Sequence, residues 1–214
     1  MKKVTLTFDN GPDPNGTTDE VLDLLREHGI RSSFFVTGTQ LSKPGARERA
    51  ERAHAEGHWI GNHTATHAIM FGDSSDPALP EREIGAPQKM IGELGHPDRL
   101  FRPYGGGGII DQRLLSRDAV TYLTEGGYTC VLWNSVPRDW EADVAWVDRC
   151  LEDVEAREWT VVVAHDLPTG GMLYLPLLLD KLKALDVGFR QDFPDECVPI
   201  RNGHVRADLS AFCR

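Results

Sequence analysis

Most of the side chains in this sequence that could perform chemistry fall in five short motifs, each directly after an apolar run typical of a strand. The motifs are TFDNG (7–11), HTATH (63–67), RPY (102–104), RDW (138–140) and VVVAH (161–165). Loops that follow parallel strands meet at one end of a sheet or barrel and build the active site there. We therefore expect one group of neighbouring side chains, formed by Asp9, Asn10, His63, His67, Arg102, Asp139 and His165.

The residue types in this group indicate hydrolytic chemistry. Two imidazoles, an amide oxygen and a nearby carboxylate suit a divalent metal with a general base beside it. His63 and His67 are spaced i and i+4, which would place both rings on one helix face within reach of a single ion. This spacing alone is often incidental, but His63 follows a strand in the same way as Asp9. With His165 as an acid, the group is equipped to hydrolyse an ester or an amide.

Some of these residues also have ordinary structural explanations. Asp9 precedes an Asn-Gly-Pro turn, where such residue pairs are common. His165 could be a core histidine bonded to a backbone carbonyl. Arg102, at the end of a strand, would need a carboxylate partner, for which Asp9 and Asp139 are the candidates. Four glycines follow at 105–108, but they lack the G-K-[ST] ending of a phosphate loop.

Strand-like and helix-like segments alternate along almost the whole chain. The expected strands are 3–8, 32–37, 58–61, 99–101, 128–133, 161–164 and 187–189, and the expected helices are 17–28, 44–56, 81–94, 116–125, 143–157 and 172–185. Thr17-x-x-Glu20 is a candidate capping box for the first helix, which ends at Gly29. About seven strand–helix units predict an α/β fold with parallel strands and helices outside. An eight-unit barrel of about 250 residues would be cramped in this length, so we expect a smaller or distorted barrel in a single domain, 1–214.

Composition narrows the function classes. Hydrophobic residues make up 40% and charged residues 26%, which is ordinary for a globular protein. The formal net charge of −10 argues against a nucleic-acid partner, because phosphate binding needs a concentrated basic face. No apolar run approaches the length of a membrane span, which is about 20 residues. The chain begins MKKVTLTFDNG without the apolar segment of a signal peptide, and its four cysteines form no C-x-x-C pair, so a cytoplasmic protein is expected.

Taken in order, TFDNG, GHWIGNHTATH (57–67), FRPY (101–104), RDW and VVVAHD (161–166) resemble the five motifs of a known family. This family is the polysaccharide deacetylases, the NodB-type carbohydrate esterases of family 4. The match runs from residue 5 to about residue 166. The resemblance implies a distorted (β/α)7 barrel of TIM-like type and metal-dependent removal of N- or O-acetyl groups from a sugar.

The resemblance also implies roles for residues of the first three motifs, as the base, its supporting arginine and the metal ligands. Asp9 corresponds to the catalytic base, which takes a proton from the attacking water. Asn10, His63 and His67 correspond to the metal ligands, and zinc is the expected ion. Arg102 corresponds to the arginine that orients the base.

The later motifs supply the acid and the walls. His165 corresponds to the general acid for the leaving amine or alcohol, and Asp139 to the carboxylate of the fourth motif. Tyr104 corresponds to the residue whose backbone N–H stabilises the oxyanion. The walls of the acetyl pocket correspond to Pro103, Trp140 and Val163.

Three departures from the family's motifs affect this assignment. Asn10 stands where the family usually has aspartate, Val136 stands at the earlier aspartate of the fourth motif, and Val163 replaces a leucine. An amide oxygen can ligate a cation but brings no negative charge to offset its desolvation, so we expect weaker metal binding. A less neutralised metal would lower the pKa of its water further. The change at Val163 should only reshape the pocket.

The sequence therefore predicts a metal-dependent deacetylase of an N-acetylated amino sugar, with a carbohydrate as its partner. The absence of a signal peptide favours oligosaccharides or lipid-linked precursors over wall polymer. One alternative is a hydrolase of another small linear or cyclic amide on the same barrel, with or without metal. Another is a sugar-binding pseudoenzyme, although a binding module has no need of an acid–base pair such as Asp9 and His165.

Overall fold

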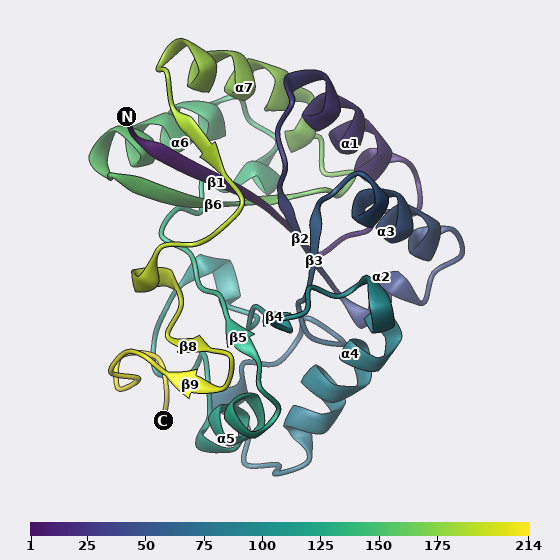
Figure 1. The fold of residues 1–214 in the computed structure, drawn as a ribbon, viewed down its shortest axis with the longest axis vertical. Helices are drawn as coiled ribbons and strands as arrows, with labels where there is room; N and C mark the ends of the chain where they lie inside the picture. Colours follow the sequence, from purple (N-terminus) through teal and green to yellow (C-terminus); the bar gives the residue numbers. More distant parts are fainter.

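Parallel strands in a curled sheet form the centre of the molecule. The computed structural model describes residues 1–214, and its helices form an outer layer around the strands (Figure 1). The parallel strands are β1 (Lys3–Asp9), β2 (Ser33–Val36), β3 (Trp59–Asn62), β4 (Leu100–Phe101), β5 (Thr129–Cys130), β6 (Trp159–His165) and β7 (Gly188–Arg190). Two short antiparallel strands, β8 (Ile200–Arg201) and β9 (His204–Val205), continue the sheet beyond β5. All seven strands expected from the sequence are present.

The sheet curls into an incomplete barrel. Its strand order is β6-β1-β2-β3-β4-β5-β8-β9, and β7 shares one edge of β1 with β2. On that edge, β7 pairs with Lys3–Thr5 and β2 pairs with Thr7–Asp9. The gap between β5 and β6 is bridged at one point, where Ser135 pairs with Val162 in parallel. The expected fold class, an α/β fold of the distorted-barrel type, is confirmed.

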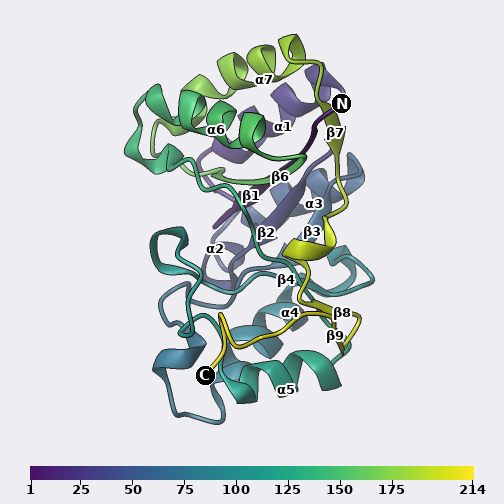
Figure 2. The ribbon, with the colours of Figure 1, turned by 90° about the vertical axis from the view of Figure 1, so that its left-hand side faces the viewer.

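The helices cover the outer surface of the sheet in both views (Figures 1 and 2). They are α1 (Thr17–His28), α2 (Gly38–Leu41), α3 (Ala46–Ala55), α4 (Ala86–Ile91), α5 (Arg117–Glu125), α6 (Ala145–Ala156) and α7 (Leu175–Ala184). The expected helix over 81–94 is divided into a π-helical turn (Glu81–Gly85), α4 and a 3-10 turn (Gly92–Leu94). Further 3-10 turns are Phe71–Asp73, Gly106–Gly108, Asp139–Glu141, Gly171–Tyr174 and Asp195–Cys197. None of the helices combines the length and apolar character that a membrane span requires.

Alternation along the central strands decides which side chains face the site. On β1, Val4, Leu6 and Phe8 pack outward in the largest core cluster, together with residues of α1, α6 and α7. The intervening residues of β1 therefore point into the barrel, because successive side chains of a strand face opposite sides. Asp9 is the last of these inward positions.

The start of α1 differs from its prediction. The proposed capping box at Thr17 is absent, because Gly16 is the N-cap residue, with a φ of 117°, and has no side chain to offer. The carboxylate of Asp13 instead accepts the backbone N–H of Thr17 at 3.1 Å. The helix ends as expected at Gly29, whose φ of 67° is in the left-handed region.

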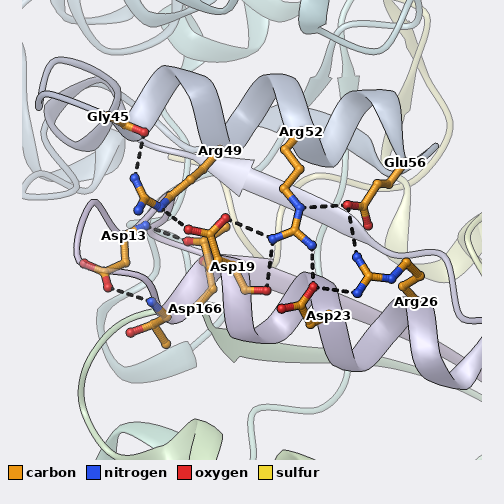
Figure 3. Close-up of polar contacts among 11 residues, drawn as sticks. Asp13, Asp19, Asp23, Arg26, Gly45, Arg49, Arg52, Glu56 and Asp166 are labelled. Atoms are coloured by element: carbon orange, nitrogen blue, oxygen red, sulfur yellow. Dashed lines mark hydrogen bonds and ion pairs between the residues drawn. The ribbon is translucent and has the colours of Figure 1, made fainter.

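An ion-pair network fixes α1 to α3 (Figure 3). Arg52 on α3 contacts Asp19 at 3.0 Å and Asp23 at 2.6 Å on α1, and Glu56 at 2.7 Å. Arg49 adds a second contact to Asp19 at 2.7 Å. Partly exposed pairs contribute little singly, but a network of this kind holds the two helices in register.

Candidate active site

The ends of β1 and β6 place the expected acid and base beside each other. Asp9 and His165 are paired residues in the parallel ladder of these strands, so both side chains emerge at the same level. They open into a cavity of about 340 Å³ at the carboxyl ends of the strands. The residues that line it are Asp9, Asn10, His63, His67, Tyr104, Gly105, Gly107, Gly108, Trp133, Val136, Arg138, Trp140, Val163, His165, Leu167 and Thr169.

Arg102 lies beneath the cavity and pairs with Asp9. Its Nη1 donates to Asp9 Oδ1 at 2.7 Å and to Thr7 Oγ1 at 2.6 Å, and the guanidinium carbon lies 4.0 Å from the centre of the Phe35 ring. Burial would raise the pKa of Asp9, but the charge of Arg102, with His63 and His165, lowers it below its usual value. Of the two partners that the sequence offered for Arg102, the structure selects Asp9, which is held ionised and oriented.

His63 and His67 present neutral imidazoles to the same cavity. His63 Nδ1 lies 2.8 Å from the carbonyl oxygen of Arg102, an acceptor that requires Nδ1 to carry the proton and leaves the Nε2 lone pair free. Burial lowers the pKa of His63, and burial together with His63 lowers the pKa of His67 to about 3. The two ring centroids are 4.8 Å apart.

The prediction that these histidines share a helix face is wrong. Residues 63–67 form an irregular loop, in which Thr64 and His67 have φ values of 68° and 54°. The buried carboxylate of Glu83 holds this loop by accepting the backbone N–H groups of Ala65 at 3.1 Å and Thr66 at 3.0 Å. The loop, rather than helical periodicity, brings the two rings together, and nothing in the local sequence pointed to Glu83.

A further observation, at Asn10, indicates that these side chains could bind a divalent cation. Asn10 Oδ1 is buried and has no hydrogen-bond partner, and such an orphaned acceptor calls for an electropositive ligand. The backbone N–H of Asn10 is held by the carbonyl of Phe35 at 3.1 Å, with a left-handed φ of 71°. Together with two neutral imidazoles, this oxygen provides an N,N,O donor set of the kind that zinc accepts. No group of three or more His, Cys, Asp and Glu side chains could hold a metal, so the set depends on Asn10.

Asp139 supports His165 and not Arg102. Its Oδ1 lies 2.8 Å from His165 Nδ1, and its Oδ2 accepts the backbone N–H of His165 at 2.9 Å. Burial would lower the pKa of His165, but the hydrogen bond and the charge of Asp139 raise it above its usual value. His165 is therefore held as a proton donor, with its Nε2 edge available to the cavity.

Three of the four residues predicted at or beside the acetyl pocket line the cavity. Tyr104, Trp140 and Val163 line the cavity, and the Trp140 ring packs edge-on against His165 with centroids 5.2 Å apart. Pro103 does not line it, because the chain stays buried from the end of β4 until Tyr104. The sequence did not single out Arg138 as a lining residue.

Asp166 is a buried carboxyl group next to the acid that the sequence prediction left without a role. Its Oδ2 accepts from Thr18 Oγ1 at 2.6 Å, and Thr18 in turn accepts the N–H of Asp13 at 2.7 Å. A Cβ at Gly11 would overlap this carboxyl group, so the turn after Asp9 packs directly against it. Asp166 thereby connects the loop after β1, the first turn of α1 and the end of β6. In the sequence, only its position directly after His165 could have indicated that Asp166 belongs to the site.

This arrangement can perform acid–base hydrolysis. An ionised carboxylate and a protonatable imidazole end adjacent strands and face one cavity, each held by a buried partner of opposite charge. The lowered pKa of Asp9 favours the ionised carboxylate that can accept a proton, and the raised pKa of His165 favours the protonated imidazole that can donate one. Neutral imidazoles and an unpartnered amide oxygen complete the cavity floor.

Comparisons with known proteins agree with this geometry. The family model described as polysaccharide deacetylase matches residues 1–131. A peptidoglycan-N-acetylglucosamine deacetylase from Bacillus cereus is 37% identical over 77% of this chain and 73% of its own length. A chitooligosaccharide deacetylase from Bradyrhizobium sp. (strain ANU 289) is 33% identical over 77% of this chain and 71% of its own length. A family 4 carbohydrate esterase from Streptomyces lividans, solved with acetate, superposes with a TM-score of 0.73 at 25% identity, covering 92% of this chain and 96% of that one.

Proposed function

This chain belongs to the polysaccharide deacetylase family, and we propose that it is a metal-dependent hydrolase that removes the acetyl group from an N-acetylated amino sugar within a carbohydrate. Family membership makes it a deacetylase acting on a non-peptide carbon–nitrogen bond. The relatives named for chitooligosaccharide and for peptidoglycan N-acetylglucosamine support a carbohydrate substrate.

One observation carries the proposal. Asp9 and His165 are ladder partners at the end of adjacent strands, and each has a buried partner that fixes its protonation state. The charge of Arg102 lowers the pKa of Asp9 and favours its ionised form, whereas Asp139 raises the pKa of His165 and favours its protonated form. A cavity that binds a sugar without chemistry needs neither arrangement.

The residues of the chain divide the reaction between them. Asp9 accepts a proton from the attacking water, and Arg102 keeps the carboxylate aimed at it. His165 donates a proton to the departing nitrogen, and Asp139 stabilises the imidazolium until that transfer. We assign the backbone N–H of Tyr104 to the developing oxyanion and the Trp140 and Val163 walls to the acetyl methyl group. A divalent cation held by Asn10, His63 and His67 would act as a Lewis acid beside these groups.

The test is acetate release from a defined substrate. Tetra-N-acetylchitotetraose should yield acetate and an equal amount of free amine, and Asp9→Asn should lower kcat by about 10²–10⁴-fold. Asp148→Asn makes the same change on an exposed face of α6 and should retain full activity. Treatment with a chelator should abolish activity, and added Zn²⁺ should restore it. Failure of the wild-type protein to release acetate under metal-replete conditions would overturn the proposal.

A second candidate is metal-free hydrolysis of a small amide on the same barrel. The observation that favours it is the third donor, which is the amide of Asn10 and not a carboxylate. Activity that survives exhaustive chelation, with no metal in the purified protein, would select this candidate.

A further inference from the structure

Arg138 is the only lysine or arginine among the residues that line the cavity. It stands on the loop between β5 and α6, two residues before Trp140, and its side chain is 57% exposed. Its φ of 65° is in the left-handed region, a strained conformation for an arginine that persists only where the surroundings impose it. The surroundings therefore fix the backbone position from which this side chain reaches the edge of the cavity.

Contacts to a neighbouring arginine impose the conformation. Arg149 on α6 donates through Nε to the carbonyl of Pro137 at 2.7 Å and through Nη2 to the carbonyl of Arg138 at 3.4 Å. The same Nη2 lies 3.0 Å from Glu141 Oε2. The other oxygen of Glu141 lies 2.9 Å from Arg138 Nε. Two guanidinium groups thus share one carboxylate and leave one positive charge in excess.

The excess charge lies beside a wall that offers no counter-charge. The Arg138 guanidinium lies 5.8 Å from the centre of the Trp140 ring, and neither of its Nη atoms takes part in a hydrogen bond. Val136, Gly105, Gly107 and Gly108 also line the cavity. The carboxylate of Asp9 is already paired with Arg102. In a chain of net charge −10, an arginine at a substrate cavity whose ion-pair partner is shared with a second arginine is an exception.

We propose that Arg138 determines substrate specificity by binding a negatively charged substituent, a carboxylate or a phosphate, on or next to the N-acetylated sugar. The inference rests on the proposed function, since it takes the cavity to be the sugar site. The two free Nη atoms suit a planar carboxylate or a phosphate, which arginine binds through paired N–H donors. The existing pair with Glu141 is partly exposed, so it does not compete strongly with an incoming anion.

The test compares disaccharides that differ in one charged group. The carboxylate arm uses N-acetylglucosaminyl-N-acetylmuramic acid, whose lactyl ether is anionic, and its lactyl methyl amide, which is neutral. The phosphate arm uses N,N′-diacetylchitobiose phosphorylated at the reducing end and unmodified N,N′-diacetylchitobiose. In at least one arm, the charged member should have a kcat/KM about tenfold higher, the effect of one charge-assisted hydrogen-bond pair. The arm with the larger ratio identifies the anion, and added salt should reduce that ratio.

Three variants connect the charge preference to Arg138. Arg138→Gln should bring the charged-to-neutral ratio to about one. Glu141→Gln leaves Arg138 in place and removes its counter-charge, so the ratio should rise above that of the wild type. Arg47→Gln removes an exposed arginine on α3, which pairs with Glu51, and should leave the ratio unchanged.

Calorimetric binding of the same disaccharides separates this inference from the proposed function. Preferential binding of a charged disaccharide that Arg138→Gln abolishes supports the inference even if no acetate is released. Equal kcat/KM and equal affinity for charged and neutral members in both arms would overturn it, while acetate release from N,N′-diacetylchitobiose would leave the proposed function standing. A ratio that Arg138→Gln does not change would also overturn it.

Discussion

Asp9 and His165 are Cα partners in the parallel ladder of β1 and β6, although 155 residues separate them along the chain. Inward-facing positions of the two strands coincide at this level, so a base and an acid meet without any local sequence relationship. Below them, Arg102 supports Asp9, and Asp139 supports His165.

The first prediction concerns the buried pair of Asp9 and Arg102. Arg102→Met leaves the Asp9 carboxylate buried without its cation, and we expect the free energy of unfolding to fall by about 3–5 kcal/mol. The double variant Asp9→Asn/Arg102→Met should recover part of this loss, because no unpaired charge remains. Urea unfolding of the single and double variants measures both values. Equal stability of the wild type and Arg102→Met would show that the pair is not electrostatically coupled.

The second prediction concerns the pH dependence set by Asp139. The charge of Asp139 raises the pKa of His165, so the acid remains protonated to higher pH in the wild type. Asp139→Asn removes that charge, the pKa of His165 falls, and the basic limb of the kcat/KM profile should move to lower pH. Profiles on an N-acetylated oligosaccharide provide the measurement. A basic limb that stays in place would assign the proton donation to another group.

The third prediction concerns the amide ligand. Asn10→Asp supplies a charged oxygen at the position of the unpartnered Oδ1, so it should tighten Zn²⁺ binding by about tenfold or more. Asn10→Ala removes the donor and should weaken binding relative to the wild type. Calorimetric titration of the three proteins gives the affinities independently of activity. Identical affinities would exclude residue 10 from the metal site.

The fourth prediction concerns stability and Asp166. Burial raises its pKa to about 7, above its usual value of 3.8, so the folded protein holds a proton that the unfolded chain has released between these pH values. This stabilising contribution is complete below about pH 4 and is lost as the pH rises through 7. Asp166→Asn has no titrating proton and should flatten the fall in Tm over that interval. Asp148→Asn, a change on the surface, should retain the pH dependence of Tm seen in the wild type. If Asp166→Asn also retained that pH dependence, Asp166 would not titrate in this interval and the prediction would be wrong.

The alternation of segments was enough to predict all seven parallel strands, because each is an apolar run between helices with clear end signals such as Gly29. Strand ends also located the site, since parallel strands place their carboxyl ends together. The lengths of the strands were less predictable. β5 was expected over 128–133 but has only two residues, and the chain beyond it contacts β6 only through Asn134 and a single bridge at Ser135.

The errors have physical causes in tertiary contacts. His63 and His67 converge through a loop that the distant Glu83 holds, which no i,i+4 pattern describes. Asp13 replaces the predicted cap of α1 because Gly16 turns the chain with a positive φ. Arg138, which the sequence did not indicate as a lining residue, lies at the cavity because its backbone is left-handed and is stabilised by Arg149 on α6. Such contacts join segments whose local sequences carry no sign of one another.

The central claim, that Asp9 and His165 act as base and acid on an N-acetyl group, is tested most directly by His165→Ala on two substrates. An N-acetylated oligosaccharide has a poor leaving group that needs a proton, whereas an activated aryl acetate does not. We predict a loss in kcat/KM of about 10²–10⁴-fold on the oligosaccharide and a much smaller loss on the aryl acetate. Equal losses on both substrates would contradict the claim, because they would show that His165 binds or positions the substrate without supplying the proton.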